Sequence, residues 1–336
     1  MNRIIITGTT GQVGYFVAKE ALERGMKVIA PVRYTASGLD KKFEEREDIY
    51  KHDNFHVVTA DLIDSASIDN IVKDVGPDYF VNCAAMSHVG ESWNIPVSTA
   101  DITGVGPVRC LDALRKFKKD CKFVQCSTSE MFGKNISGKI NEETPLKAMS
   151  PYGAAKIYAH EMVRIYRESY NMSCSCVIMF NNFSRLRTKT FFTRKCTSKM
   201  AEVLSGEIDN IQFGNLNFCR DWGYSGDYAK AIHLMLTSDN KDDYVVATGE
   251  KHTGKEFIDL AFRFGNDYLE LKNVDFRFDF EQHIKTNTSE FMRPNDLTYL
   301  VGDSSKIRSK LGWKPVVSFE TLVKDMVYYD LGKVFQ

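Results

Sequence analysis

Short apolar runs alternate with segments of helical periodicity through the first half of the chain. RIIIT at 3–7 is followed by Val13, Val17 and Ala21, spaced i, i+4 and i+8, and then by KVIAPV at 27–32. Similar β-branched runs predict further strands at 55–59, 79–83, 122–126 and 173–180, with helical segments between them. This alternation is typical of βαβ units. It predicts an α/β fold with a Rossmann-like, doubly wound parallel sheet, whose ligands bind at the carboxyl ends of the strands.

The pattern changes near residue 181, where helices and short strands are separated by polar loops. We therefore expect two parts. A Rossmann domain covers 1–180, and parts of 225–250 return to it. A smaller α+β lobe covers most of 181–336.

Composition and charge narrow the possible partners. The 336-residue chain has 44 basic and 44 acidic residues, so it lacks the positive field that drives binding to nucleic acid. Its eight cysteines are scattered through apolar stretches, without the spacing of a zinc site or the density of a disulfide scaffold. The apolar run in MNRIIITG is too short for a signal peptide, and no later stretch has the length of a membrane span. We expect a cytoplasmic protein with reduced thiols, no metal and no membrane partner.

A glycine-rich loop follows the first predicted strand and opens a helix that runs to about Arg24, with Gly25 as its C-terminal cap. The loop is GTTGQVG at 8–14, with the spacing GxxGxxG. Glycines in this context permit a tight turn and let backbone N–H groups approach a pyrophosphate at the helix N-terminus. The alternative is an ordinary flexible turn. The candidate cofactor residues in the loop are Gly8, Thr10, Gly11, Gln12, Val13 and Gly14.

The end of the second predicted strand bears on which dinucleotide binds. An acid there would accept hydrogen bonds from a ribose 2′-OH, but the stretch is APVRYTAS, with no acid. Arg33, helped by Ser37, could instead pair with the 2′-phosphate of NADP, although a solvent-exposed arginine is the competing interpretation. Asp61 and Leu62 follow the third strand and could flank an adenine; Asp61 could equally be a turn residue or the cap of a helix at 65–75. Ala84, after the fourth strand, is a further candidate cofactor contact.

SPYGAAK at 150–156 carries two helix-start signals, a serine at the N-cap and a proline at the first helical position. Tyr152 and Lys156 are then i and i+4 on one helix face. An ammonium near the phenol would favour its ionised form, which makes Tyr152 a candidate general base for an alcohol. The alternative is a tyrosine packed on the sheet and a lysine in water.

CSTSEMFG at 126–133 places hydroxyls and a carboxylate directly after the fifth predicted strand. Thr128 can hydrogen-bond an alcohol that is being oxidised. Alcohol–ketone exchange needs only the hydroxyl, the tyrosine and the lysine, so Glu130 indicates a second proton transfer. The alternative is that Glu130 is a loop acid or a helix cap.

Several longer segments of the chain contain these motifs or lie between and after them. They include SHVGESWNIPVSTAD (87–101), STSEMFG (127–133), SPYGAAKIYAHEMVRIYRESY (150–170), FGNLNFCRDWGYSGDY (213–228) and LGWKP (311–315). Together they resemble the GDP-mannose 4,6-dehydratases, a family of extended short-chain dehydrogenases/reductases, over nearly the whole chain. The resemblance implies a redox-neutral dehydration with NADP bound to residues 1–180, in which Tyr152, Lys156 and Thr128 act at the sugar C4 hydroxyl. Glu130 would take the C5 proton and help expel the C6 hydroxyl.

The resemblance also implies where the substrate binds. The partner is GDP-mannose or a related nucleotide sugar, and its GDP portion is assigned to the second lobe. The implied substrate-binding residues are Ser87, His88, Ser129, Asn181, Lys195, Arg220 and Arg293. Tyr152 and Lys156 are implied to contact the cofactor as well. The family resemblance further implies a homo-oligomer, either a dimer or a tetramer.

Three segments depart from the family pattern. NNFSRLRTK at 181–189 stands where the family has an NHESPRRG-like run, YTASGLDKKF follows Arg33 in place of a second arginine and a serine cluster, and 273–291 differs from the family loop. Other functions therefore stay open at this point: another nucleotide-sugar dehydratase, an epimerase, a decarboxylase, a 4-reductase, or a non-catalytic NADP-binding regulatory protein.

Overall fold

The computed structural model describes residues 1–336 except 35, 37–42, 135–137, 240, 289–296 and 336. Its centre is a seven-stranded sheet in the order β11-β6-β5-β4-β1-β2-β3, and all neighbouring pairs are parallel. The strands are β1 (Arg3–Thr7), β2 (Lys27–Val32), β3 (Phe55–Thr59), β4 (Tyr79–Asn82), β5 (Lys122–Thr128), β6 (Cys174–Met179) and β11 (Tyr244–Val246). The order reverses direction between β1 and β4, which is where ligands bind in open α/β sheets. The predicted Rossmann-like sheet is confirmed.

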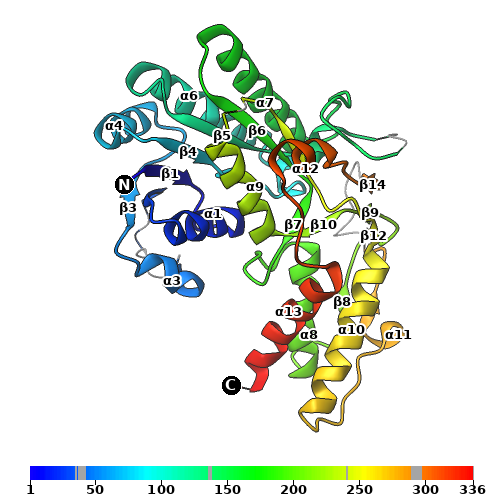
Figure 1. The fold of residues 1–336 in the computed structure, drawn as a ribbon. Coiled ribbons are helices and arrows are strands. Elements are labelled where there is room, and N and C mark those ends of the chain that lie inside the picture. The colour runs from blue at the N-terminus through cyan, green and yellow to red at the C-terminus, as the bar shows by residue number, and fades with distance from the viewer. Residues whose placement is uncertain (35, 37–42, 135–137, 240, 289–296, 336) are drawn as a thin grey trace.

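Helices cover both faces of this sheet (Figure 1). One face packs apolar side chains from α4 (Ser65–Val75), α6 (Gly106–Phe117) and α7 (Pro151–Tyr170). The other face packs α1 (Gln12–Glu23), α9 (Ser225–Thr237) and α12 (Ser305–Leu311). The short helices α3 (Glu47–Tyr50) and α5 (Pro96–Thr99) lie in connections, and a π-helical segment, η3 (Ala100–Val105), leads from α5 into α6. Crossover helices on both faces explain why the strands are apolar on both sides.

The remaining elements form a second lobe with its own apolar core. It contains α8 (Phe192–Leu204), α10 (Gly254–Leu271), α11 (Phe280–His283) and α13 (Phe319–Gly332). Its short strands are β7 (Asn181–Phe183), β8 (Ile211–Gln212), β9 (Cys219–Arg220), β10 (Trp222–Tyr224), β12 (His252–Thr253), β13 (Ile284–Lys285) and β14 (Tyr299–Leu300). Figure 1 shows α8, α10 and α13 together below the sheet. Among the described helices, none combines the length and the apolar composition that crossing a membrane requires.

The predicted bounds of helices and strands agree closely with the observed ones where the local sequence signals are strong. β1, β2 and β3 have the predicted bounds, α4 occupies 65–75, and Gly25 follows α1 with a φ of +71°. The fourth strand ends at Asn82 rather than at residue 83, and the sixth begins at Cys174. β5 runs two residues further than predicted, to Thr128, because Ser127 and Thr128 pair with Ile178 and Met179 of β6.

Candidate active site

One cavity of about 1160 Å³ lies at the carboxyl ends of the strands and extends to the second lobe. It is lined by every predicted site residue that the structure describes; Arg293 and Ser37 lie outside the described residues. The lining cofactor candidates are Gly8, Thr10, Gly11, Gln12, Val13, Gly14, Arg33, Asp61, Leu62 and Ala84; the others are Ser87, His88, Thr128, Ser129, Glu130, Tyr152, Lys156, Asn181, Lys195 and Arg220.

The glycine loop forms a cradle that side chains would fill. Gly8 has a φ of +74°, and a Cβ there would lie 2.8 Å from the backbone nitrogen of Ala84. A Cβ on Gly14 would lie 2.2 Å from the carbonyl oxygen of Gly8. The N-cap of α1 is Gly11, no side chain caps the helix, and its first turn carries no acid. Open N–H groups and the helix dipole favour an anion here, so the loop fits the pyrophosphate of a dinucleotide.

A Gly14→Ala substitution is expected to abolish tight dinucleotide binding while the chain still folds. The added methyl group would displace the Gly8 carbonyl, and an overpacked contact of this kind costs about 1–3 kcal/mol. Titration with NADPH, followed by its fluorescence, measures the affinity, and circular dichroism reports the fold. The matched control is Gly332→Ala in α13, where the nearest atom would be 3.5 Å away. An affinity of Gly14→Ala close to that of the parent chain would contradict the cradle.

Two predicted cofactor residues follow the ends of β2 and β3, and the structure shows which local role Asp61 has. Asp61 is a turn residue, because its carboxylate accepts the Ile63 N–H at 3.2 Å. The interpretation of Asp61 as the cap of α4 is wrong: Asp64 is the N-cap, and its carboxylate accepts the Ala66 N–H at 3.0 Å. Arg33 directly follows β2 and is exposed, and it lines the cavity.

The start of α7 positions Tyr152 and Lys156 as predicted, since Ser150 is the N-cap and accepts the Gly153 N–H at 3.1 Å. Lys156, however, donates to the carbonyl of Cys126 at 2.6 Å, and its Nζ lies 5.8 Å from the centroid of the Tyr152 ring. Burial lowers the pKa of Lys156.

The pKa of Tyr152 is shifted in the direction opposite to the prediction. Burial raises this pKa above its ordinary range, and the Glu130 carboxylate adds to the rise. A hydrogen bond with Thr128 and the charge of Arg187 act the other way. The predicted lowering is wrong for the protein in this structure, because the loss of hydration outweighs the nearby donors and cations.

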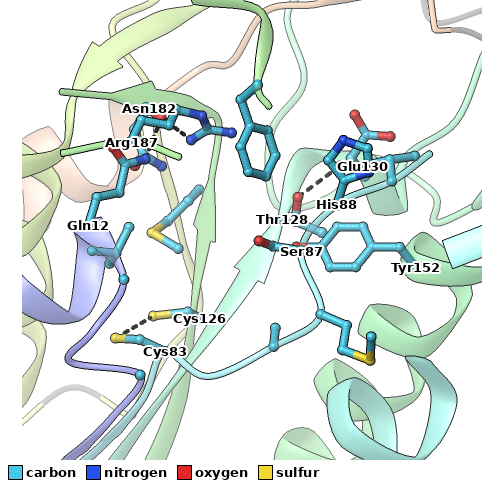
Figure 2. A pocket seen from close by; sticks show the side chains of 18 of the residues that line it. Gln12, Cys83, Ser87, His88, Cys126, Thr128, Glu130, Tyr152, Asn182 and Arg187 are labelled. Carbon is cyan, nitrogen blue, oxygen red and sulfur yellow. Dashed lines mark hydrogen bonds between the residues drawn. The ribbon is translucent and has the colours of Figure 1, made fainter. Parts of the chain in front are cut away.

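Thr128, Glu130 and Tyr152 lie together on one side of the cavity (Figure 2). Thr128 is the last residue of β5, and its hydroxyl accepts the Glu130 N–H at 3.3 Å. This bond holds the 3₁₀ turn Ser129–Met131, which carries Glu130 to the cavity. Ser87 and His88 are on the same side, and the His88 ring is 5.4 Å from that of Phe191. A hydroxyl, a phenol and a carboxylate thus line the same side of the cavity.

Sequence reasoning missed Arg187, which lines the cavity on the side of Gln12 and Asn182 (Figure 2). Its guanidinium donates to the Asn182 carbonyl at 2.7 Å and lies 4.0 Å from the centroid of the Phe191 ring. Burial of this group lowers its pKa to about 10. The only signal in the sequence was the unusual segment 181–189, where one cation among several could not be singled out. Gln12, in α1, also contacts segment 181–189, because its side-chain amide donates to the Asn182 carbonyl at 3.0 Å.

The unusual Phe183 of this segment is a core residue. Its side chain is buried and packs edge-on against Trp222 and Phe257, with ring centroids 6.1 and 5.8 Å away. An apolar residue in place of an acid therefore extends the core of the second lobe toward the cavity.

The N-terminus of α8 is a second place for an anion. No side chain caps this helix, and its first turn carries no acid. The buried hydroxyl of Thr193 and the amide oxygen of Asn181 have no hydrogen-bond partner among the described residues, and both residues line the cavity. Lys195 and Arg220 add positive charge, each beside an aromatic ring, Phe213 and Phe218. This end of the cavity suits a diphosphate attached to a planar base.

Comparison with known proteins agrees with this arrangement. The family model described as GDP-mannose 4,6 dehydratase matches residues 5–326. GDP-mannose 4,6 dehydratase of Homo sapiens is 37% identical over 98% of this chain and 91% of its own length. GDP-mannose 4,6-dehydratase of Yersinia enterocolitica is 33% identical over 100% of this chain and 95% of its own length.

Solved structures with the same fold include dTDP-glucose 4,6-dehydratase from Bacillus anthracis, in complex with NAD. Its TM-score is 0.81 at 21% identity, with 98% of this chain and 96% of that chain covered. UDP-glucose 4-epimerase from Thermotoga maritima has a TM-score of 0.82 at 22% identity, covering 99% of this chain and 100% of that chain. At this identity the structures establish the fold alone. From the family model and the relatives together, this chain belongs to the GDP-mannose 4,6-dehydratase family.

Proposed function

We propose that this protein converts GDP-mannose to GDP-4-keto-6-deoxymannose, a hydro-lyase reaction with no net change in the redox state of its cofactor. The observation that carries the proposal is the convergence of Thr128, Glu130, Tyr152 and Lys156 on one cavity. The presence of Glu130 beside Tyr152 favours a dehydratase over an epimerase or a 4-reductase, which need no second proton transfer.

In the first step Tyr152, in its phenolate form, accepts the proton of the C4 hydroxyl and becomes a neutral phenol. Thr128 is hydrogen-bonded to the phenol and orients it. Lys156 is anchored on the Cys126 carbonyl in the cavity wall and contributes positive charge beneath the ring. The hydrogen bond with Thr128 and the charge of Arg187 stabilise the phenolate, whereas burial raises the pKa of Tyr152, so the phenolate is a strong base and the phenol then holds the proton firmly. That property suits a group that must return the proton later.

In the second step Glu130 takes the C5 proton, which the neighbouring C4 ketone makes acidic, and delivers a proton to the departing C6 hydroxyl. A nicotinamide bound there would supply the hydride chemistry that links oxidation at C4 to reduction at C6. The cavity is lined by residues from the sheet and from the second lobe, so both parts of the chain surround the space proposed for the reacting sugar.

The cofactor in this proposal is NADP, held by the glycine loop, Arg33, Asp61, Leu62, Ala84, Tyr152 and Lys156 within residues 1–180. The support for NADP is the exposed Arg33 at the end of β2, where no acid stands to accept a ribose 2′-OH.

Replacing Arg33 by alanine is expected to weaken NADP binding about tenfold or more, because a hydrogen bond to a charged group is worth about 1.5–3 kcal/mol. NAD, which lacks the 2′-phosphate, should bind equally well to both forms. Titrations with the two dinucleotides measure the difference. Arg24→Ala is the control, since Arg24 pairs with Glu20 at the end of α1 and is not a cavity residue. Equal losses for both dinucleotides would contradict a 2′-phosphate contact.

We assign the nucleotide sugar mainly to residues 181–336. The N-terminus of α8, Lys195 and Arg220 are proposed to hold the diphosphate, together with Asn181 and Arg293. Ser87, His88 and Ser129 are proposed to contact the sugar. The support is the uncapped helix end with two cations and two buried polar atoms around one end of the cavity.

We also propose that the protein works in the cytoplasm as a homodimer or tetramer. Tyr158 and Ile165 are 46% and 38% exposed and lie i, i+7 on one face of α7, with Val97 of the adjoining α5 81% exposed. Such apolar surface is characteristic of an interface between subunits. Light scattering on the purified chain measures the oligomeric state.

The experiment that tests the function is mass spectrometry of GDP-mannose incubated with the protein and a catalytic amount of NADP. Loss of one water without accumulation of NADPH is the expected result. Cofactor binding without water loss would overturn the proposal and direct the search to other nucleotide sugars. No turnover of any sugar nucleotide would support a regulatory NADP-binding protein.

A further inference from the structure

Two cysteines that the proposed chemistry does not use lie side by side in the cavity wall. Cys83 follows β4 and Cys126 is in β5, and their sulfurs are 3.5 Å apart (Figure 2). Each of the eight cysteines, all within the described ranges, is a free thiol. We propose that Cys83 and Cys126 are an oxidisable dithiol, and that their disulfide lowers the affinity of the site for its dinucleotide. The second half of this inference rests on the proposed function.

The backbone is compatible with a disulfide. β4 and β5 are parallel, and the register pairs Asn82 with Gln125, so Cys83 and Cys126 are the next opposed residues. Adjacent strands lie about 4.7–4.9 Å apart. That spacing falls within the about 4.4–6.8 Å between Cα atoms that disulfides span. The sulfurs must approach from 3.5 Å to about 2.05 Å, which rotation of the side chains and a small shift of the strand ends can provide.

The two thiols differ in their exposure to the cavity, and this difference determines which of them is oxidised first. Cys83 is partly exposed toward the cavity, whereas Cys126 is buried. Hydrogen peroxide would therefore oxidise Cys83 first, to a sulfenic acid, with release of water. The Cys126 sulfur then displaces the second water as the S–S bond forms. Both S–H bonds and the peroxide O–O bond break, the thiols lose two electrons, and the two protons leave in water.

Other cysteines lack this arrangement. The sulfurs of Cys121, Cys174 and Cys176 contact backbone carbonyls. The hydrogen bond to Cys126 and burial raise the pKa of Cys83 well above its ordinary value. Oxidation should consequently be slow, since the thiolate is the reactive form.

The position of the pair links it to both sides of the cofactor site. The Cys83 carbonyl carbon would lie 3.0 Å from a Cβ on Gly8, so the backbone of Cys83 packs directly against the glycine loop. The Cys126 carbonyl holds Lys156 at 2.6 Å. A crosslink that draws the two strand ends together moves the loop and the lysine relative to each other. Coupled sites typically affect one another about 5–150-fold, and the coupling is reciprocal, so a bound dinucleotide should also oppose the disulfide.

The test uses the full chain, reduced and then incubated with hydrogen peroxide. Free thiols are blocked with N-ethylmaleimide, and peptide mass mapping identifies any linked pair. NADPH affinity is measured before oxidation, after it, and after dithiothreitol. Cys83→Ala removes one partner, and Cys110→Ala, at a buried cysteine of α6 whose sulfur is not in the cavity wall, is the matched control.

The expected result is a Cys83–Cys126 peptide pair lacking two hydrogens, a fall in NADPH affinity of about tenfold, and recovery with dithiothreitol. Cys110→Ala should behave like the parent chain, and Cys83→Ala should show neither change. A chain that keeps eight alkylatable thiols, or that forms the pair without losing affinity, would overturn the inference. If the reduced chain binds no NADPH at all, the proposed cofactor is wrong, a result that the mass map distinguishes from failure of the dithiol.

Discussion

A Glu130→Gln variant is expected to oxidise the sugar at C4 and then stop. Tyr152, Thr128 and Lys156 remain in place, so the first proton transfer still has its base. The amide cannot accept the C5 proton, and loss of a positioned acid or base typically costs about 10²–10⁴-fold in rate. The variant should therefore hold reduced nicotinamide and a 4-ketosugar, whereas the parent enzyme shows neither during turnover.

Absorbance of the reduced nicotinamide and mass spectrometry of the sugar measure this outcome, and incubation in heavy water adds a second readout. The parent enzyme should place deuterium at C5 of the product, and Glu130→Gln should not exchange that position. Tyr152→Phe should fail earlier, with no reduction of the cofactor. Glu91→Gln, at another glutamate that lines the cavity, is the matched control and should retain turnover. Water loss by Glu130→Gln at the parent rate would rule out the proposed role of this carboxylate.

Asp330→Ala is expected to cause the largest loss of stability in the second lobe. Asp330 in α13 and Arg194 in α8 are 3% and 2% exposed, and their two hydrogen bonds are 2.8 and 2.7 Å long. The carboxylate also accepts the Thr197 hydroxyl at 2.7 Å, and Arg194 donates to the Arg185 carbonyl. Removing one member of such a pair leaves an unpaired buried charge and costs about 3–5 kcal/mol.

Denaturation in urea measures the free energy of unfolding. Glu47→Ala is the control, because Glu47 and Lys51 form an ion pair with both side chains more than half exposed, and such pairs contribute about 0–1 kcal/mol. An Arg194→Met/Asp330→Leu double variant should recover most of the loss, since it leaves no unpaired charge. A loss for Asp330→Ala as small as that of the control would contradict this account. Because Arg194 supports segment 181–189 through Arg185, Asp330→Ala should also weaken substrate binding.

Local patterns in the sequence were sufficient to predict the main strands, the start of α7 and the glycine loop. The bounds of β1, β2 and β3, the start of α7 at Ser150 and the glycine loop depend on residues close together in the chain. Their signals are side-chain periodicity, capping oxygens and the absence of Cβ atoms, all of which act over a few residues. The motifs around Thr128, Glu130 and Tyr152 likewise identified the family and one side of the cavity.

Contacts between residues far apart in the sequence determined the features that local patterns did not predict. Pairing with β6 extended β5 to Thr128, and no local pattern predicts the ion pair of Arg194 and Asp330, which are 136 positions apart. The side chain of Lys156 turned to a carbonyl on β5, and burial raised the pKa of Tyr152 where spacing alone predicted a fall. The sequence by itself thus determined the sheet, its loop and the identity of the reactive groups. Only the tertiary structure decided which groups meet and how strongly they hold protons, because hydration and charge depend on neighbours that folding brings from distant parts of the chain.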